Sequence, residues 1–312
     1  MTPLARRLVK RHGLDPEKIE GTGANGRITR NDVLKALEQL EAEPEKETEA
    51  KAEEEKPEAQ QAEQKQEAPK TAPAAEKPSV ELGEEDEPVP LSSMRRRIAA
   101  RLVHSKQTIP HVTTVVECDM TACAGARKKH KEEWESDGLK LSYMPFIMKA
   151  TCDALQEFPA INSSWGGDKL IHHKRVHLAI AIAVEGGLAV PVIRNADGMS
   201  MRELAKALTT VADHARKGKL TSEEVSGSTF TITNPGIFGA VFSTPIINPP
   251  NAAILGTGRI AETPVVLDGE IVARMMMYLC LSYDHRIVDG ETAIKFLGHM
   301  GDALEKAEFD MG

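Results

Sequence analysis

The chain has 312 residues, of which 41% are hydrophobic and 28% are charged, enough apolar material for a core in one large or two smaller domains. It contains no run of about 18 apolar residues and no charged start followed by an apolar signal stretch, so we expect neither a membrane span nor secretion. The four cysteines form no C-x-x-C pair and stand among apolar residues, which predicts buried thiols in a cytoplasmic protein without a metal site.

The net charge of −8 hides three regions of different character. Residues 1–40 carry a net charge of +3, residues 41–87 carry −11, and the remaining 225 residues are neutral. Residues 41–87 consist mostly of Glu, Lys, Ala, Pro and Gln without an aromatic residue, so they cannot bury enough surface to offset their ordering entropy. We therefore predict a small helical domain over 1–40, a disordered acidic linker over 41–87 and a folded body over 88–312.

The head should contain two short amphipathic helices, one starting at Pro3 and one after Thr29, which forms a capping pair with Asp32. Their inward-facing residues are Leu4, Leu8, Val9, Val33, Leu34 and Leu37. Between the helices, residues 21–26 read G-x-G-x-x-G, but no apolar strand precedes them and no long helix follows. We interpret this segment as a tight loop that aims Arg27, and not as a nucleotide site.

Residues 3–37, above all EGTGANGRITRNDVLKAL (20–37), resemble the peripheral subunit-binding domain of dihydrolipoamide acyltransferases. The resemblance implies that Arg6, Lys10 and Arg27 form a basic clamp for the 2-oxo acid dehydrogenase and dihydrolipoyl dehydrogenase components. Arginine suits this role because its planar guanidinium pairs with carboxylates through two bonds, and charge steers the encounter. The head offers no aromatic platform for bases, so no nucleic acid is expected as a partner.

The body alternates helical segments with β-branched runs, which predicts an α/β domain with a mixed sheet flanked by helices. We expect helices over 93–104, 141–158, 201–217 and 291–307. Strands are expected over 112–118, 177–184, 188–193, 229–233, 252–259 and 276–282, with the second and third of these forming a hairpin across Glu185–Gly187.

Directly after the last predicted strand comes DHRIVDG (284–290), an H-x-x-x-D-G motif. A strand end holds a catalytic group rigidly, and the ordinary pKa of histidine, near neutrality, suits a general base. Taken alone, the motif also fits a structural His–Asp pair at a turn. Asp284 and Arg286 are expected to stabilise this turn by ion pairing.

Four segments of the body are similar, in this order, to the catalytic domain of dihydrolipoamide acyltransferases: PLSSMRRRIAARL (90–102), FTITNPGIFG (230–239), STPIINPPNAAILGTGR (243–259) and SYDHRIVDG (282–290). The resemblance implies a chloramphenicol-acetyltransferase-like fold and transfer of an acyl group between a dihydrolipoyl thiol and coenzyme A. It implies His285 as the catalytic base and Thr233, where the family has a serine, as the oxyanion donor. For Asp289, a catalytic and a structural role stay equally open.

The resemblance also implies a homotrimer or larger core, with the active site between subunits. The chain contains no acidic-Lys-Ala hairpin, so we expect the lipoyl group on another domain or on a carrier in trans. The tail KAEFDMG lacks the leucine-rich end that joins trimers into larger cores in the family, which favours a trimer.

Two other interpretations remain open. A stand-alone chloramphenicol-type acetyltransferase shares the histidine motif but would lack the head, and a non-enzymatic scaffold would not need His285 and Thr233. For the acyl group, STPIINPP and MMYLCLSYDHR resemble the succinyl branch, whereas TITNPG and GRIAETP resemble acetyl- and branched-chain enzymes. We expect no function for seven other histidines: His104, His111, His130, His172, His173, His214 and His299.

Arg6→Ala and Arg27→Ala should each weaken binding of a dehydrogenase partner, without altering transfer to free dihydrolipoamide, because the linker separates head from body. The affinity should also fall as salt rises, since the contact is ionic. Titration calorimetry at low and high salt measures this, and an unchanged Kd for both variants at low salt would refute the clamp.

Overall fold

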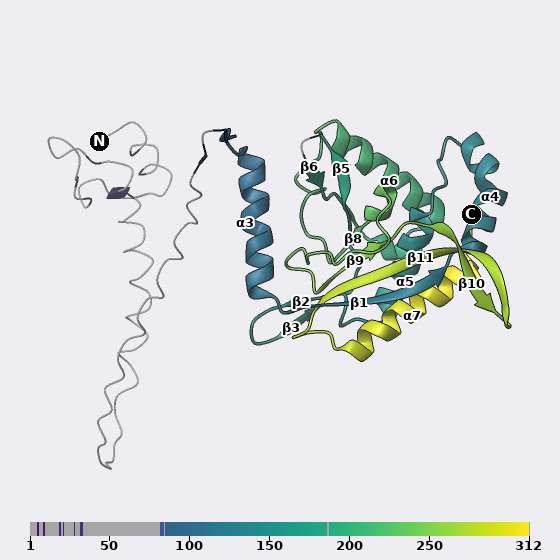
Figure 1. The fold of residues 1–312 in the computed structure, drawn as a ribbon. Coiled ribbons are helices and arrows are strands. Elements are labelled where there is room, and N and C mark those ends of the chain that lie inside the picture. The colour runs from purple at the N-terminus through teal and green to yellow at the C-terminus, as the bar shows by residue number, and fades with distance from the viewer. Residues whose placement is uncertain are drawn as a thin grey trace, which may run out of the picture. The chain divides into compact units, whose positions relative to one another are not determined.

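The structure is a computed structural model, and it divides the chain into two compact units, Met1–Leu82 and Gly83–Gly312 (Figure 1). The division lies five residues before the boundary that we expected. The structure describes residues 82, 83, 85–185 and 187–311, and in the head only residues 5, 9, 19, 21, 28, 32 and 33.

In the head, the described apolar residues form one buried cluster. Ala5, Val9, Ile19 and Val33 are its members, and Ile28 packs against them. Val9 and Val33 are thus buried as predicted, and both lie in helical backbone. The predicted clamp residues, the glycine loop from residue 22 to 26 and the linker up to residue 81 lie outside the described residues.

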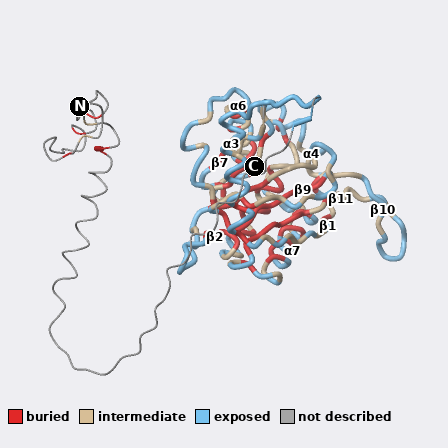
Figure 2. The backbone as a smooth tube through the Cα atoms, turned by 60° about the vertical axis from the view of Figure 1, so that its left-hand side comes forward, coloured by how far each residue is buried: buried red, intermediate tan, exposed pale blue. Residues whose placement is uncertain are grey.

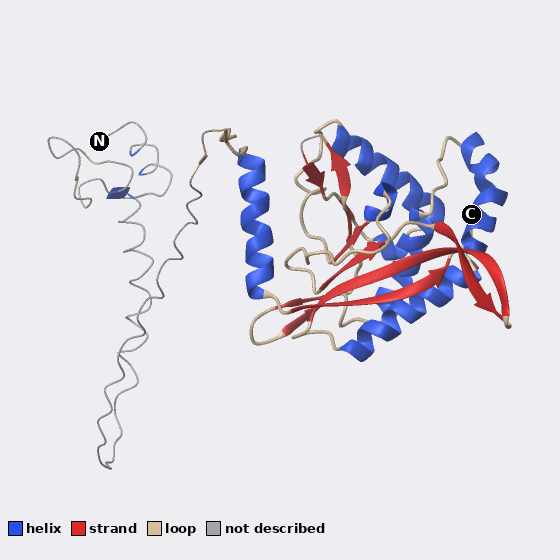
Figure 3. Ribbon diagram, in the orientation of Figure 1, coloured by secondary structure: helices blue, strands red, loops and turns tan. Residues whose placement is uncertain are grey.

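The body is built on a seven-stranded mixed sheet (Figure 3). Its strand order is β1 (His111–Asp119), β11 (Glu270–Asp284), β9 (Ala253–Thr257), β8 (Phe230–Thr233), β4 (Leu178–Ile180) and β7 (Val192–Ile193), and β10 (Ala261–Leu267) also pairs with β11. β8 runs parallel to β4 and β9, and the other pairs are antiparallel. Two small antiparallel sheets pair β2 (Ser163–Trp165) with β3 (Leu170–His172) and β5 (Ile182–Val184) with β6 (Gly187–Ala189).

Five α-helices of the body are described: α3 (Ser93–Thr108), α4 (Thr121–Ser136), α5 (Met144–Glu157), α6 (Met201–Arg216) and α7 (Gly290–Lys306). α5 contacts both α6 and α7, and α7 also packs along β1. α7 buries Ala293, Phe296, Leu297, Met300 and Leu304, a stripe of helical period. None of the described helices is long and apolar enough to cross a membrane.

The core lies between the sheet and helices α5–α7, where the buried parts of the chain gather (Figure 2). β11 is buried along its second half, where β1 and β9 flank it, while its first half extends with β10 as an exposed arm (Figure 2). All four cysteines are buried and free, as predicted. Burial raises the pKa of the Cys123 and Cys152 thiols to about 12.

All four predicted helices of the body are present, with ends shifted by four residues or fewer. The predicted hairpin is correct in pairing but splits into β4–β7 and β5–β6. It splits because the amide of Ala181 donates to Ile232 of β8 and leaves the hairpin ladder. Helix α4 was missed, since its polar sequence buries only Cys123 and Trp134 and so shows no apolar face.

Two glycines allow the turn after β8 to press against the end of β9. A Cβ atom on Gly236 would lie 2.2 Å from the carbonyl oxygen of Gly258, and a Cβ on Gly258 would lie 1.9 Å from that of Val241. The amide of Arg259 donates to Ala240 at 2.8 Å and so closes the crossing. Glycine at these two positions therefore fixes the backbone that follows Thr233.

Gly258→Ala should lower the free energy of unfolding by about 1–3 kcal/mol, the usual effect of forcing an atom into a filled space. Gly298→Ala is the matched control, because nothing lies within 4 Å of a Cβ there and alanine has a higher helix propensity than glycine within α7. Urea unfolding, followed by the fluorescence of the fully buried Trp134 at one protein concentration, compares the two variants. Equal midpoints would contradict the tight crossing.

Candidate active site

His285 follows the last residue of β11 and is exposed. Its amide donates to the carbonyl of Pro110, in the corner between α3 and β1, at 3.1 Å. Its ring lies 5.7 Å from that of the buried Tyr283, measured between centroids. The backbone of His285 is thus held while its imidazole stays accessible, which is the arrangement a general base needs.

Asp284 and Arg286 form the expected ion pair beside His285. The Arg286 guanidinium donates to both carboxylate oxygens of Asp284, at 2.6–3.2 Å, and the Arg286 amide donates as well. The carboxylate is almost fully buried, and the same guanidinium stacks over Trp165 with 4.7 Å to the ring centroid. The pairing with Asp284 raises the pKa of Arg286. This pair fixes the turn that carries His285 and has no free proton acceptor.

Asp289 is the N-cap of α7. Its carboxylate accepts a hydrogen bond from the Thr292 amide at 2.7 Å. That bond lowers the pKa of the carboxyl, and the positive charge that His285 can carry lowers it further. The geometry therefore gives Asp289 a structural task.

Thr233 is the last residue of β8 and lines a cavity of about 530 Å³. The cavity is enclosed by α3, by residues 225–228 and by the segment Pro245–Pro250. Among the described residues, none forms a hydrogen bond with the Thr233 hydroxyl, which is half-buried. The volume suits a small-molecule site, and the hydroxyl can donate to a bound group.

The structure does not bring Thr233 and His285 together within one chain. In the sheet, Thr233 is level with Gly256 of β9, and Gly256 is level with Cys280 of β11. Asp284 lies four residues beyond Cys280, roughly 13 Å along the strand, and two strand spacings of roughly 5 Å each separate β8 from β11. The side chain of neither residue spans this gap, and His285 does not line the cavity.

Sequence reasoning missed a polar network on the floor of this cavity. The buried Asn251 accepts from the Thr231 hydroxyl at 2.7 Å and donates to the carbonyl of Ser228 at 2.7 Å. Asn248 donates to Thr231 at 3.4 Å. A buried asparagine needs such partners, but Thr231 and Ser228 stand 20 and 23 residues before Asn251, so no local sequence pattern indicates them.

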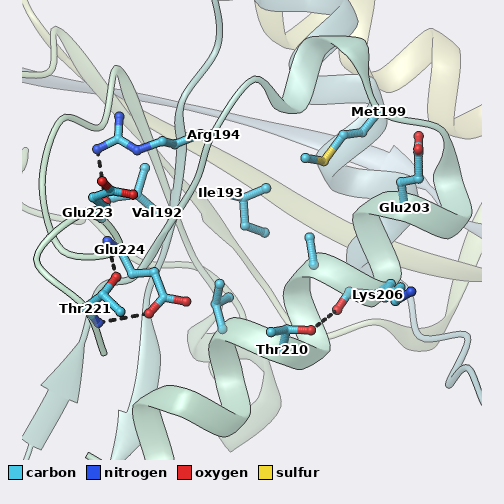
Figure 4. A pocket seen from close by; sticks show the side chains of 12 residues that line it. Val192, Ile193, Arg194, Met199, Glu203, Lys206, Thr210, Thr221, Glu223 and Glu224 are labelled. Atoms are coloured by element: carbon cyan, nitrogen blue, oxygen red, sulfur yellow. Dashed lines mark hydrogen bonds between the residues drawn. The ribbon is translucent and has the colours of Figure 1, made fainter. Parts of the chain in front are cut away.

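A second cavity of about 560 Å³ lies between α6 and residues 221–224 (Figure 4). Two of its carboxylates already serve the fold: Glu203 caps α6, and Glu224 binds His214 at 2.8 Å and the Thr221 amide at 2.9 Å. Arg194 donates to the carbonyl of Glu223 (Figure 4). None of the predicted catalytic residues lines this cavity. In the described part of the chain, no three His, Cys, Asp or Glu side chains are placed to hold a metal ion.

Comparison with known proteins gives two family matches. Residues 83–311 match the 2-oxoacid dehydrogenases acyltransferase (catalytic domain) family, and residues 1–34 match the E3 binding domain family.

Among curated relatives, the chain is 42% identical to the dihydrolipoyllysine-residue succinyltransferase component of the 2-oxoglutarate dehydrogenase complex of Cupriavidus necator, covering 97% of this chain and 70% of that protein. It is 40% identical to the lipoamide acyltransferase component of the branched-chain alpha-keto acid dehydrogenase complex of Bacillus subtilis, covering 98% and 71%. Among solved structures, the dihydrolipoamide acetyltransferase of Azotobacter vinelandii superposes with a TM-score of 0.70 at 36% identity, covering 74% of this chain and 98% of that one.

Asp289→Asn should keep the cap of α7 and leave turnover within about threefold, because asparagine caps helices as well as aspartate does. Asp289→Ala should lower Tm by roughly 2–4 °C, the effect of losing a cap in a domain of this size. The carboxyl of Asp289 has a lowered pKa in the folded protein. The contribution of this cap to folding stability should therefore be complete above about pH 4 and be lost as the pH falls through the lowered pKa.

Thermal melting and acyl-transfer assays on both variants check this. If Asp289→Asn melts normally but loses a hundredfold or more in turnover, the carboxylate takes part in the chemistry.

Proposed function

Because the chain belongs to the 2-oxo acid dehydrogenase acyltransferase family, we propose that His285 is its catalytic base and Thr233 its oxyanion donor. The chain is a dihydrolipoyllysine-residue acyltransferase and works as a component of a 2-oxo acid dehydrogenase complex. Coenzyme A and the dihydrolipoyl group are both its substrates. The exposed imidazole of His285 on a fixed backbone and the unengaged hydroxyl of Thr233 in the cavity support these assignments.

The chemistry needs one proton acceptor and one hydrogen-bond donor. In the direction of acyl-coenzyme A synthesis, His285 takes the proton from the thiol of coenzyme A, and the thiolate attacks the carbonyl carbon of the acyl thioester. The carbonyl oxygen becomes an oxyanion, which accepts a hydrogen bond from the Thr233 hydroxyl. When the intermediate collapses, the carbon–sulfur bond to the dihydrolipoyl group breaks, and His285 returns the proton to the departing thiolate. No electrons are gained or lost.

The single observation that carries the model of a shared site is the distance between Thr233 and His285 in one chain. Thr233 and His285 lie two strands apart and at different positions along the strands, so they cannot both contact one carbonyl group within a single chain. A neighbouring copy of the chain can supply the missing group. We therefore propose a homotrimer in which each site takes His285 from one subunit and Thr233 from the next. A trimer is the smallest cyclic assembly that the family resemblance suggests.

A spacing match with the Azotobacter vinelandii enzyme supports the residue assignment. A serine, a histidine and an asparagine have been investigated in its catalytic mechanism, and the serine precedes the histidine by 52 positions, as Thr233 precedes His285. The asparagine follows the histidine by four positions, as Asp289 follows His285. An uncharged amide at this spacing agrees with a cap at Asp289 and does not require a carboxylate.

The head supports the proposal of partners within the complex. Residues 1–34 match the E3 binding domain family, so we propose that Arg6, Lys10 and Arg27 bind the dehydrogenase and dihydrolipoyl dehydrogenase components. We also propose that the lipoyl group arrives on another domain or chain. The four free, buried cysteines support a cytoplasmic location.

A direct assay tests the function. Acetyl-, succinyl- and isobutyryl-coenzyme A are each presented with free dihydrolipoamide, and kcat/KM is compared. One of the three should be preferred by at least tenfold. Transfer from none of them would contradict an acyltransferase, and transfer to chloramphenicol in place of dihydrolipoamide would favour the stand-alone acetyltransferase.

His285→Ala should lower turnover by roughly 10² to 10⁴, the usual weight of a positioned acid–base group, and Thr233→Ala by roughly 10² to 10³. When the two variants are unfolded and refolded together in equal amounts, about a quarter of the sites should recover, because each intact half arrives with a probability of about one half. A site within one subunit would recover nothing.

The matched control mixes wild type with the double variant His285→Ala/Thr233→Ala. A shared site should again leave about a quarter of the sites intact, whereas a site within one subunit should leave about half. Equal recoveries in the two mixtures support the shared site, and a recovery of none in the first mixture with half in the second would exclude it.

A further inference from the structure

The segment Pro245–Pro250 forms one wall of the cavity beside Thr233, and all six of its residues line that cavity. Three of the six are prolines, which lack an amide hydrogen, so the segment has few backbone donors with which to anchor itself. Ile247, at its centre, is fully buried and packs with Ile109 and Ile254. Whatever binds the backbone of Ile247 therefore sets the position of the wall.

Both backbone groups of Ile247 bind side chains from the corner between α3 and β1. Its amide donates to Nε2 of His111 at 3.1 Å, and its carbonyl accepts from the hydroxyl of the buried Ser105 at 2.7 Å. Two residues further on, Arg101 of α3 donates to the carbonyl of Pro249 at 2.9 Å. Three side chains from α3 and β1 thus bind the backbone of the wall, and among them His111 alone changes charge near neutral pH.

The partners of His111 fix its tautomer. Nε2 accepts the Ile247 amide and so carries no hydrogen, and Nδ1 lies 2.9 Å from the carbonyl oxygen of Ile109, which accepts only from a protonated nitrogen. The imidazole is therefore neutral with its hydrogen on Nδ1. A protonated imidazole would direct an N–H from Nε2 at the N–H of Ile247, and this hydrogen bond would be lost.

We infer that His111 is a positioning residue that holds the wall Pro245–Pro250 against the corner between α3 and β1, and that protonation of its ring releases the wall. The inference rests on the proposed function in one respect, namely that the cavity receives the acyl-transfer substrates. His111 also opens β1 directly opposite Asp284, and the next corner residue, Pro110, accepts the amide of His285. One corner therefore anchors both the cavity wall and the strand end that carries the catalytic base.

The charged groups around His111 come from two elements. From α3, Lys106 disfavours protonation, and from β11, Asp284 favours it, although Arg286 already neutralises that carboxylate. The wall itself has no ionisable side chain, and His285 follows Asp284 in the same turn. Burial is the largest influence and lowers the pKa of His111 below the ordinary 6.5. The hydrogen bond to Ile247 should thus be complete above about pH 6.5 and be lost as the pH falls through the lowered pKa.

Hydrogen exchange of the full-length chain reports on the wall without any substrate. A peptide spanning Pro245–Pro250 contains only the amides of Ile246, Ile247 and Asn248, so its mass follows the Ile247 amide together with just two others. At pH 7.5, His111→Phe should accelerate exchange of the Ile247 amide by about tenfold, the effect of losing one hydrogen bond. His111→Gln should stay near wild type, because a glutamine oxygen can take the place of Nε2.

The pH profile separates positioning from simple space filling. Corrected for intrinsic rates, exchange at Ile247 should accelerate in wild type as the pH falls from 7.5 to 5, whereas His111→Gln should show no such rise, since its amide does not titrate. His104→Gln is the matched control: His104 is an exposed histidine on α3, and its variant should follow wild type throughout.

In the transfer assay at pH 7.5, His111→Phe should raise KM for the substrates by about tenfold with kcat within about threefold, and His111→Gln should restore KM. Unaltered exchange at Ile247 in His111→Phe, or an unchanged acid-dependent rise in His111→Gln, would overturn the inference. If His111→Phe fails to fold, the glutamine profile alone decides. A wild-type chain without transfer activity would refute the proposed function and leave the exchange result standing, so the two failures are distinguishable.

Discussion

The antiparallel pairing of β11 with β1 is the interaction on which the rest of the body depends. Nine residue pairs join the two strands, from His111 opposite Asp284 to Asp119 opposite Met276. Because the register runs to the last residue of β11, the corner between α3 and β1 must lie beside His285. A slip of one residue would turn the buried side chains of β11 to the other face, so the hydrophobic core and the position of His285 are set together.

The same sheet separates Thr233 from His285, the two groups that we propose for acyl transfer. β8 ends at the level of Cys280, while His285 lies beyond the end of β11, and the strands are two positions apart. The sheet keeps them apart within one chain, and in the proposed trimer a neighbouring subunit supplies the missing group. This separation is the physical reason for the proposed trimer, in which each subunit would offer His285 at its surface and Thr233 in its cavity.

Polar side chains, and not apolar packing, hold three parts of the proposed site in one arrangement. The Asp284–Arg286 pair fixes the turn after β11, the Asp289 cap fixes the start of α7, and the asparagine network fixes the floor of the cavity. Asp284 and Asn251 are buried, and a buried donor or acceptor left without a partner costs more than a neutral contact gains. The exposed Asp289 acts as a cap, because it accepts a backbone amide that has no partner within the helix. His111 belongs to this group and differs from the others because its hydrogen bonds depend on its charge.

The sequence by itself determined the helices of the body, most of its central strands and the buried cysteines, because composition, apolar period and capping residues are local properties. The motif at residues 284–290 and the hydroxyl at Thr233 were likewise readable, through their spacing and their resemblance to a family. Helix α4 was not predicted because it buries too few apolar side chains to show a helical pattern. Strand β10 was not predicted because it is exposed and contains Pro264.

Only the tertiary structure decided which of these residues meet. From the sequence, a catalytic and a structural role for Asp289 were equally open, and in the structure its carboxylate accepts a hydrogen bond from the Thr292 amide at the start of α7. His111 has no local pattern, and its partner Ile247 stands 136 residues away. Contacts of such separation depend on strand register and loop path, which are settled by the packing of the whole domain and not by the residues on either side.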